Sequence, residues 1–197
     1  MPPMAMAQSS ALSVPNLLTY GRIAIIPVII ACLYSSDPTW LWTAFVLFIV
    51  AAITDYLDGY LARAWSQQSN LGKMLDPIAD KLLVGAVLIM LAANGTLTGL
   101  SLIPAIIILS REILVSGLRE YLGQLYLSLP VSNLAKWKTT VQLVALAVLI
   151  AGPAAEALVP GSLAIGLALL WAAALLTVWT GYDYVRLGIA HLVAEDQ

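Results

Sequence analysis

Charge is scarce in this sequence of 197 residues, where 9 basic and 11 acidic side chains make up only 10% of the chain. Soluble domains carry roughly 25% charged residues. Because 61% of the residues are hydrophobic and the mean hydropathy is +0.92, there are too few polar groups to cover a globular surface. These values exclude an ordinary soluble domain and leave no basic surface for nucleic acid. The solvent of this protein is therefore largely lipid.

Cysteine and histidine are almost absent. Cys32 cannot form an intramolecular disulfide and His191 has no second histidine beside it, so a disulfide framework and a histidine or cysteine metal site are both excluded. The first eleven residues contain no Lys or Arg and do not resemble a secretory signal. We expect a disordered tail over residues 1–11, one membrane domain over 12–190 and a C-terminal tail over 191–197.

Six apolar runs are long enough to cross a bilayer, which takes roughly 20 residues per helix. They are separated by short segments rich in turn-forming residues. We therefore predict an all-α integral membrane protein with six transmembrane helices. The runs are Leu17–Tyr34, Trp40–Leu61, Ile78–Ala93, Leu100–Leu118, Trp137–Ala151 and Ser162–Tyr184.

Basic residues are missing from the first, third and fifth connections, the last of which is predicted as a turn segment from Gly152-Pro153 to Pro160-Gly161. All nine lie near the start of the first run, around the second and fourth connections, or after the sixth run. With an even number of spans these places share one face, and Lys and Arg mark the cytoplasmic face of a membrane protein. The distribution predicts that both termini are cytoplasmic. We expect the protein to reside in the cell inner membrane.

Four carboxylates are present within a short segment. Asp55 and Asp58 end the second predicted helix, and Asp76 and Asp80 begin the third, so that each pair shares one helix face. The short connection makes the two helices antiparallel neighbours, which brings the four side chains together. They would repel one another in a poorly solvated site unless a cation were bound. Oxygen ligands favour Mg²⁺, Mn²⁺ or Ca²⁺, and four carboxylates could hold two ions.

Each part of this segment has an alternative interpretation. Asp76 precedes a proline and could be the N-cap of a helix. Asp58 and Gly59 could form a hairpin turn. Gly59 and Ala62 could serve close helix packing. If they instead form a surface for a ligand, the guanidinium of Arg63 would offer paired N–H donors for a pyrophosphate. Their combination in one segment favours a binding site.

A second charged group surrounds the fourth connection. Arg111 and Arg119 are eight residues apart and therefore lie within about 80° of one another around a helix. Lys136 and Lys138 begin the next helix about 200° apart, so that one of them points inward. A ligand that carries a phosphate requires such a cluster, whereas serine or a neutral polyol does not. The alternative is that Arg111 only pairs with an acidic neighbour, Glu112 or Glu120.

The acidic segment resembles the complete signature of the CDP-alcohol phosphotransferase family, membrane enzymes of phospholipid synthesis. The matching string is Asp55-x2-Asp58-Gly59-x2-Ala62-Arg63-x8-Gly72-x3-Asp76-x3-Asp80. Further blocks are similar to the bacterial members that make phosphatidylglycerol phosphate. These blocks are Pro15–Thr19 with Arg22, Leu75–Lys81, Arg111–Glu120 and Lys136–Thr140.

The resemblance implies transfer of the phosphatidyl group from CDP-diacylglycerol to sn-glycerol 3-phosphate, with Asp80 as general base. It also implies a homodimer and Mg²⁺ or Mn²⁺ as cofactor, with two ions expected. The metal ligands would be Asp55, Asp58, Asp76 and Asp80. The contacts to CDP-diacylglycerol would be Asn16, Thr19, Arg22, Gly59, Ala62, Arg63, Ser69 and Gly72. With the cation cluster as the acceptor site, the contacts to glycerol 3-phosphate would be Arg111, Arg119, Lys136 and Lys138.

Other functions remain open at this point. Within the family, the acceptor could instead be phosphatidylglycerol, as in a cardiolipin synthase, or an inositol phosphate or serine. A protein of a different class, a divalent-cation transporter, could also place carboxylates in a membrane. The acids, however, cluster at one predicted interface rather than along a path through the membrane. Metal-dependent release of CMP separates an enzyme from a transporter.

Overall fold

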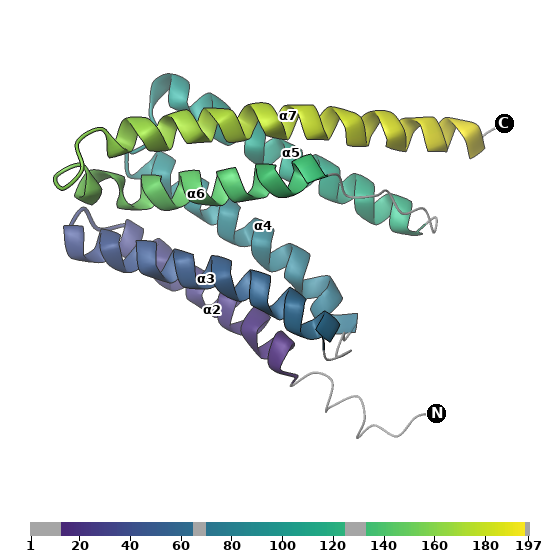
Figure 1. Ribbon diagram of the computed structural model, residues 1–197, viewed down its shortest axis with the longest axis horizontal. Coiled ribbons are helices and arrows are strands. Elements are labelled where there is room, and N and C mark those ends of the chain that lie inside the picture. Colours follow the sequence, from purple (N-terminus) through teal and green to yellow (C-terminus); the bar gives the residue numbers. More distant parts are fainter. Residues whose placement is uncertain (1–12, 65–69, 125–132, 196–197) are drawn as a thin grey trace. The chain divides into compact units, whose positions relative to one another are not determined.

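A computed structural model describes residues 13–64, 70–124 and 133–195. In these ranges it contains long α-helices and one short 3-10 helix, with no β-strand (Figure 1). This confirms the prediction of an all-α protein. The elements are α2 (Val14–Leu33), α3 (Pro38–Ala64), α4 (Asn70–Ala93), η1 (Gly99–Ser101), α5 (Leu102–Gln124), α6 (Asn133–Ala155) and α7 (Ser162–Glu195).

Five of these helices, α2, α3, α5, α6 and α7, are both long enough and apolar enough to cross a membrane. The sixth, α4, has 24 residues but carries Asp76, Asp80 and Lys81 in its first half. The chain is therefore a multi-pass membrane protein, as predicted. That α4 also crosses the membrane stays a prediction.

The backbone rules out two alternative interpretations of the acidic segment. Because α4 begins at Asn70, Asp76 lies in its second turn and Pro77 inside the helix, so the interpretation of Asp76 as an N-cap is wrong. Helix α3 continues through Asp58 and Gly59, which excludes a hairpin turn there. A proline lacks an N–H but is tolerated inside membrane helices, where other groups satisfy the freed carbonyl.

Two further helices contain an internal proline, α2 at Pro27 and α6 at Pro153. Helix α6 runs on to Ala155 and includes Gly152 and Pro153, so the turn predicted at these two residues is wrong. The turn begins only after Ala155, where the N–H of Glu156 still donates to the carbonyl of Gly152 at 2.9 Å. Proline near the end of a helix removes one donor without ending the helix.

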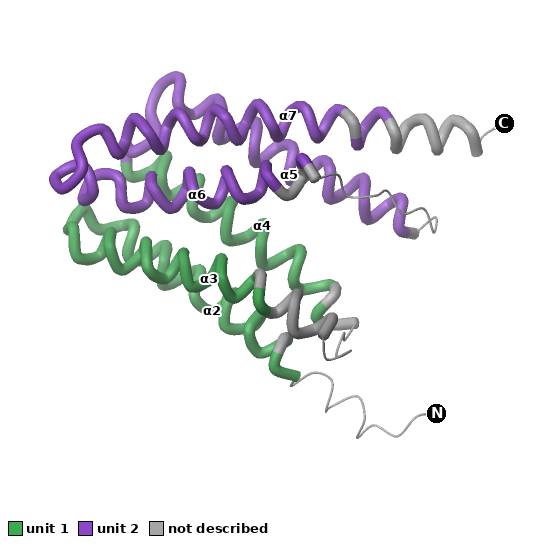
Figure 2. The backbone as a smooth tube through the Cα atoms, in the orientation of Figure 1, with its two compact units in different colours: residues 1–94 green, residues 95–197 purple. Residues whose placement is uncertain are grey.

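The helices form two compact units, residues 1–94 and residues 95–197 (Figure 2). In unit 1, α2 packs against both α3 and α4. Its buried residues recur every three or four positions, as expected for a helix with one packed face. This face is polar at the start of the helix and apolar beyond it. Its polar members are Asn16, Thr19 and Arg22, and its apolar members include Ile26, Ile29 and Leu33.

The connection between α2 and α3 is a short turn closed by Asp37. Its Oδ1 accepts the N–H of Thr39 at 2.7 Å, and its carbonyl accepts the N–H groups of Trp40 and Leu41. Asp37 therefore caps the N-terminus of α3. The turn reverses the chain, so that the far end of α3 returns towards the start of α2.

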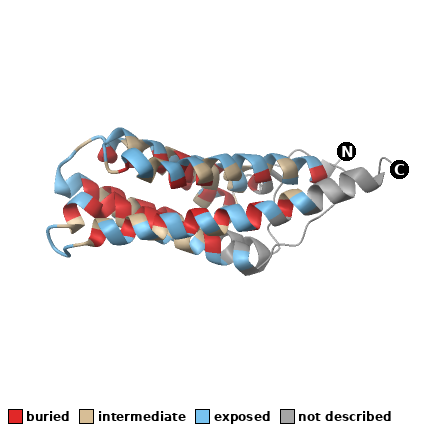
Figure 3. Ribbon diagram, turned by 90° about the horizontal axis from the view of Figure 1, so that it is seen from above, coloured by how far each residue is buried: buried red, intermediate tan, exposed pale blue. Residues whose placement is uncertain are grey.

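In unit 2, α7 packs against both α5 and α6. Two glycines allow the close approach of α6 and α7. A Cβ atom on Gly166 would lie 2.9 Å from Leu149, and one on Gly152 would lie 2.9 Å from Leu163. Small residues serve this purpose in membrane helices. Buried and exposed residues alternate along each helix (Figure 3), and the exposed side chains of α7 include large apolar ones suited to lipid, such as Trp179.

The turn between α6 and α7 is closed by Glu156. Its carboxylate accepts the N–H of Gly161 at 2.7 Å, the N–H of Leu163 at 2.9 Å and the hydroxyl of Ser162 at 3.0 Å. These hydrogen bonds hold the pKa of Glu156 below its ordinary value, because they stabilise the charged form. Gly161 has φ +89°, a left-handed conformation that favours glycine. The turn therefore fixes the start of α7.

Candidate active site

The polar face of α2 contacts one predicted metal ligand on each neighbouring helix. Thr19 Oγ1 donates a hydrogen bond to Asp76 Oδ1 of α4 at 2.5 Å. One turn later, Arg22 Nη1 lies 2.5 Å from Asp55 Oδ1 of α3. Two residues that were predicted to bind CDP-diacylglycerol therefore lie beside two predicted metal ligands. In unit 1 these four side chains form one cluster, which we call the acid cluster.

The two sides of the ion pair differ in exposure. The side chain of Arg22 is completely buried, whereas that of Asp55 is 41% exposed. A buried guanidinium needs a charged partner, because removing the partner leaves an uncompensated charge. Arg22 therefore fixes one oxygen of Asp55 while the carboxylate stays open to a ligand. The charge of Asp76 acts on Asp55 as well, and two neighbouring carboxylates repel one another.

The remaining predicted ligands lie partly outside the described residues. Asp80 lies one turn after Asp76 on α4 and is partly exposed, and Gly72 on the same helix is buried. The described side chains contain no group of three acids, histidines or cysteines placed for a metal ion. Convergence of four carboxylates stays a prediction, because Asp58 is not among those side chains. For Asp58, Gly59, Ala62 and Arg63 the structure describes only the helical backbone, and Ser69 lies outside the described residues.

The donor set of this cluster fits a hard divalent cation. Asp55 and Asp76 supply carboxylate oxygens, which Mg²⁺ and Mn²⁺ prefer over nitrogen or sulfur. Thr19 and Arg22 orient two of these carboxylates through contacts to one oxygen each. Such outer partners commonly fix the ligands of metal sites. The acid cluster therefore has the donor type that a hard divalent cation prefers.

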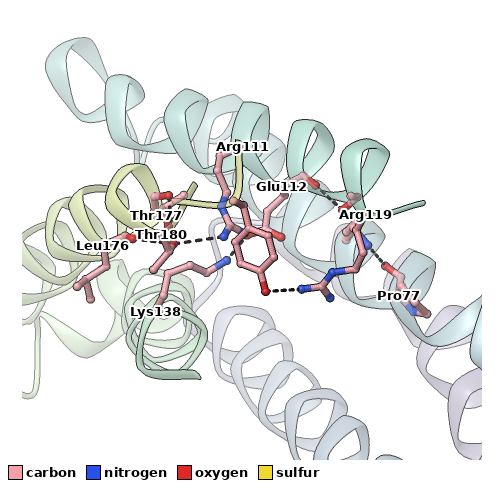
Figure 4. Close-up of polar contacts among 11 residues, drawn as sticks. Pro77, Arg111, Glu112, Arg119, Lys138, Leu176, Thr177 and Thr180 are labelled. Atoms are coloured by element: carbon pink, nitrogen blue, oxygen red, sulfur yellow. Dashed lines mark hydrogen bonds and ion pairs between the residues drawn. The ribbon is translucent and has the colours of Figure 1, made fainter. Parts of the chain in front are cut away.

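Unit 2 contains a second cluster, made of cations around one carboxylate (Figure 4). Glu112 Oε1 accepts a hydrogen bond from Lys138 Nζ and lies 3.4 Å from Arg111 Nη1. Lys138 is only 4% exposed, although it carries a charge. Glu112 thus joins a cation of α5 to a cation of α6. We call Arg111, Arg119 and Lys138 with Glu112 the cation cluster.

The last helix also contacts this cluster. Arg111 Nη2 donates to Thr180 Oγ1 at 3.2 Å, and Thr180 Oγ1 in turn donates to the carbonyl of Leu176 at 2.8 Å (Figure 4). Arg119 Nη2 donates to Tyr184 Oη at 3.0 Å. Thr180 and Tyr184 are not among the site residues predicted from the sequence. Their signal is a set of polar and small residues spaced three or four apart in the last apolar run.

The structure locates three of the four cations that were predicted to bind the acceptor. Arg111 and Arg119 both face the ring of Tyr184, in agreement with the prediction that they share one side of their helix. Lys138 is the buried lysine at the start of α6, and the side chain of Lys136 lies outside the described residues. The pairing of Arg111 with Glu112, considered as an alternative, exists, and Lys138 shares it.

Some buried polar atoms near these helices are not satisfied by the protein. Gln142, one turn after Lys138, is 3% exposed, and Thr177, one turn before Thr180, is fully buried. Among the described residues, Gln142 Oε1, Thr177 Oγ1 and Arg111 Nε have no hydrogen-bond partner. Buried polar atoms are normally paired. Their presence is typical of a region that binds a polar ligand or water.

Comparison with known proteins identifies the family. The sequence model described as CDP-alcohol phosphatidyltransferase matches residues 12–179. A Rickettsia bellii protein named CDP-diacylglycerol–glycerol-3-phosphate 3-phosphatidyltransferase is 48% identical over 174 residues, which cover 88% of this chain and 94% of the relative. A Cereibacter sphaeroides protein of the same name is 41% identical, with 93% and 98% covered. A cardiolipin synthase (CMP-forming) from Oryza sativa subsp. japonica is 38% identical, with 89% and 57% covered. The chain belongs to the CDP-alcohol phosphatidyltransferase family.

Proposed function

We propose that this protein transfers the phosphatidyl group of CDP-diacylglycerol to sn-glycerol 3-phosphate and releases phosphatidylglycerol phosphate and CMP. The relatives from Rickettsia bellii and Cereibacter sphaeroides are named for this activity, and the similarity covers nearly their whole length. The structural observation that supports this choice of acceptor is the cation cluster, in which Arg111 and Lys138 both contact Glu112. Buried cations of this kind suit a phosphate group.

The acid cluster is the proposed site for the pyrophosphate of the lipid. Asp55, Asp58, Asp76 and Asp80 would hold Mg²⁺ or Mn²⁺, which neutralises the negative charge of a bound pyrophosphate. Thr19 and Arg22 keep Asp55 and Asp76 in place before the substrate arrives. The other proposed contacts to CDP-diacylglycerol are Asn16, Gly59, Ala62, Arg63, Ser69 and Gly72.

The reaction requires one proton transfer and one displacement. Asp80 accepts the proton of the primary hydroxyl of glycerol 3-phosphate, which is the role of a general base. The hydroxyl oxygen then forms a bond to the β-phosphorus of CDP-diacylglycerol. The bond from this phosphorus to the bridging oxygen breaks, and CMP leaves with the electron pair. Holding both substrates in the correct orientation supplies much of the rate of such a reaction.

The acceptor is held by its phosphate. We assign this contact to Arg111, Arg119 and Lys138, with Lys136 as a further donor. A charged hydrogen bond to a phosphate is stronger than one to a neutral hydroxyl. The cation cluster therefore favours glycerol 3-phosphate over an acceptor without a terminal phosphate.

A cardiolipin synthase is the second candidate, because one relative carries that name. Its acceptor, phosphatidylglycerol, has no phosphate monoester. The experiment is an assay of the purified protein with CDP-diacylglycerol and each of four acceptors: glycerol 3-phosphate, phosphatidylglycerol, inositol 1-phosphate and serine. We expect CMP release and a phosphatidylglycerol phosphate product only with the first. Preference for any other acceptor would contradict the proposed function, and no CMP release at all would favour a transporter.

The proposed location is the inner membrane, with the active site facing the cytoplasm. The distribution of basic residues supports this orientation, and it puts Asn94 outside and Ser69 inside. In a Cys32→Ala background, a cysteine at each position should react with an impermeant maleimide from opposite sides. Labelling of position 94 from the cytoplasm alone would reverse the orientation.

The proposed homodimer is supported by the family resemblance, and its mass in detergent can be measured by light scattering.

A further inference from the structure

The last helix carries a narrow polar stripe in an otherwise apolar sequence. Thr177, Thr180, Gly181 and Tyr184 are spaced by three or four residues and therefore share one face of α7. All four are buried, and Tyr184 is 6% exposed. A tyrosine hydroxyl buried among membrane helices needs a partner. This stripe faces the arginines of α5.

Tyr184 contacts both arginines at once. Its hydroxyl accepts a hydrogen bond from Arg119 Nη2 at 3.0 Å. Its ring centroid lies 5.4 Å from Arg119 Cζ and 6.0 Å from Arg111 Cζ, within the range of a cation–π interaction. Two guanidinium groups eight residues apart on one helix are thus held by a single aromatic side chain of another helix.

The neighbours of Tyr184 complete this support. Thr180 accepts a hydrogen bond from Arg111 at 3.2 Å. At Gly181 the backbone lies against the stem of Arg111, because a Cβ atom there would be 3.0 Å from Arg111 Cγ and 3.4 Å from its Nε. The stripe therefore fixes both the stem and the head of Arg111.

The physical problem that this arrangement solves is repulsion. The positive charges of Arg111 and Arg119 act on one another, and such like charges move apart unless something holds them. The negative face of an aromatic ring lowers this repulsion. A pair of cations held at a fixed spacing binds a phosphate with less loss of side-chain freedom.

We propose that Tyr184 is a positioning residue that holds Arg111 and Arg119 ready for the phosphate of the acceptor, so that α7 contributes to acceptor binding. The inference rests on the proposed function, since it assumes that these arginines bind that phosphate. Tyr184 acts through the arginines and touches no reacting atom. Its removal should therefore weaken the acceptor and leave the lipid donor unaffected.

The test compares Tyr184→Phe and Tyr184→Leu with Tyr182→Phe, in which the tyrosine of the same helix is 65% exposed. The KM values for glycerol 3-phosphate and CDP-diacylglycerol are measured separately. We expect the acceptor KM to rise roughly 3- to 10-fold in Tyr184→Phe, which loses the hydrogen bond, and roughly 10- to 100-fold in Tyr184→Leu, which also loses the ring. The donor KM should stay unchanged, and Tyr182→Phe should match the wild type.

A double mutant separates positioning from a general effect on stability. When Arg119 is already replaced by alanine, Tyr184→Phe should add little to the acceptor KM, because the hydrogen bond it removes no longer exists. Additive effects, or equal increases in both KM values, would overturn the inference. Failure of the wild type to use glycerol 3-phosphate overturns the proposed function as well. An unchanged acceptor KM in both Tyr184 variants, with a wild type that uses glycerol 3-phosphate, overturns only the inference.

Gly181→Ala offers an independent test that leaves Tyr184 in place. The added methyl group pushes against the stem of Arg111, so we expect a rise in acceptor KM of roughly 2- to 10-fold with an unchanged donor KM. Gly117→Ala on α5 is the matched control, because a Cβ atom there meets nothing within 4 Å. Equal acceptor KM values in the two glycine variants would contradict a role of α7 in placing Arg111.

Discussion

Units 1 and 2 share a pattern of helix packing, but their charged clusters have opposite signs. Each has one helix that packs against the two others, α2 in unit 1 and α7 in unit 2. In unit 1 a buried Arg22 lies among carboxylates, and in unit 2 Glu112 lies among cations. The majority charge of each cluster indicates what it can bind, a cation in the first and a phosphate in the second. The minority charge balances the cluster when no ligand is bound.

The two minority charges differ in how they are held. Arg22 is completely buried and contacts Asp55, which is 41% exposed. Glu112 is 15% exposed and is shared by Arg111 and Lys138, which are themselves mostly buried. The acid cluster is thus sealed on its basic side and open on its acidic side. In the cation cluster the exposed member is Arg119, so this cluster is open on its basic side, where the hydroxyl of Tyr184 accepts a hydrogen bond from Arg119.

The largest effect is expected from neutralising the acid cluster. Asp55→Asn or Asp76→Asn should lower CMP release in detergent by at least about 100-fold, because a bound cation supplies several kcal/mol to the transition state. EDTA should do the same to the wild type. Asp37→Asn at the other end of α3 is the matched control, since asparagine caps a helix as well as aspartate does.

Two outcomes would contradict a metal-binding role of the acid cluster. Full activity in EDTA after removal of bound metal would show that the carboxylates have another role. Loss of helical circular dichroism in Asp55→Asn would assign the carboxylate to folding, as the partner of the buried Arg22.

A smaller and more selective effect is expected in the cation cluster. Arg111→Ala and Arg119→Ala each remove a charged hydrogen bond worth roughly 1.5–3 kcal/mol, which corresponds to about 10- to 150-fold in the acceptor KM. The KM for CDP-diacylglycerol should change much less. Arg186→Ala on α7 is the matched control, because this arginine is exposed. Equal changes in both KM values would show that the two units do not divide the substrates between them.

The smallest effect concerns stability at the turn between α6 and α7. Glu156 has a pKa below its ordinary value because it accepts three hydrogen bonds in the folded state. A lowered folded pKa adds stability above the unfolded pKa, and this contribution disappears as the pH falls through the folded pKa. Glu156→Gln should therefore lower the Tm by a few degrees at pH 7 and by less below about pH 4.

The control for this effect is Glu120→Gln, the same chemical change at an exposed position of α5. It should alter the Tm much less at either pH. A Tm difference between the wild type and Glu156→Gln that stays constant from pH 7 to pH 3 would contradict the role of the charge and leave only a role in packing.

The helices and the chemical type of each cluster could be predicted from the sequence, for physical reasons. Membrane spans require long apolar runs, which are visible in the sequence. Charged residues within or beside such runs are costly, so Asp55, Asp76 and Arg111 could be recognised as candidate site residues. The start of α4 was missed because Pro77 resembles the first residue of a helix. The proline is tolerated inside the helix, and α4 begins at Asn70.

The contacts between helices could not be predicted. Helical spacing says which residues share a face, but it does not say which helix that face meets. The bond from Thr19 to Asp76 and the support of two arginines by Tyr184 depend on how α2 and α7 are packed and rotated. Glu112 was weighed only as a partner of Arg111, because nothing in the spacing reveals that Lys138 reaches it from another helix.

The buried face of α2 changes from polar to apolar along the helix, and we expect this change to mark the depth of the proposed active site in the membrane. Asn16 and Arg22 are six residues apart, about 9 Å of helix, and the buried face beyond them is apolar. We therefore expect the acid cluster to lie near the membrane surface, at the level of lipid head groups. A lipid that reacts there keeps its acyl chains among its neighbours, which avoids a cost of about 0.8 kcal/mol for each methylene brought into water. Substrate and product can then enter and leave sideways, within the leaflet.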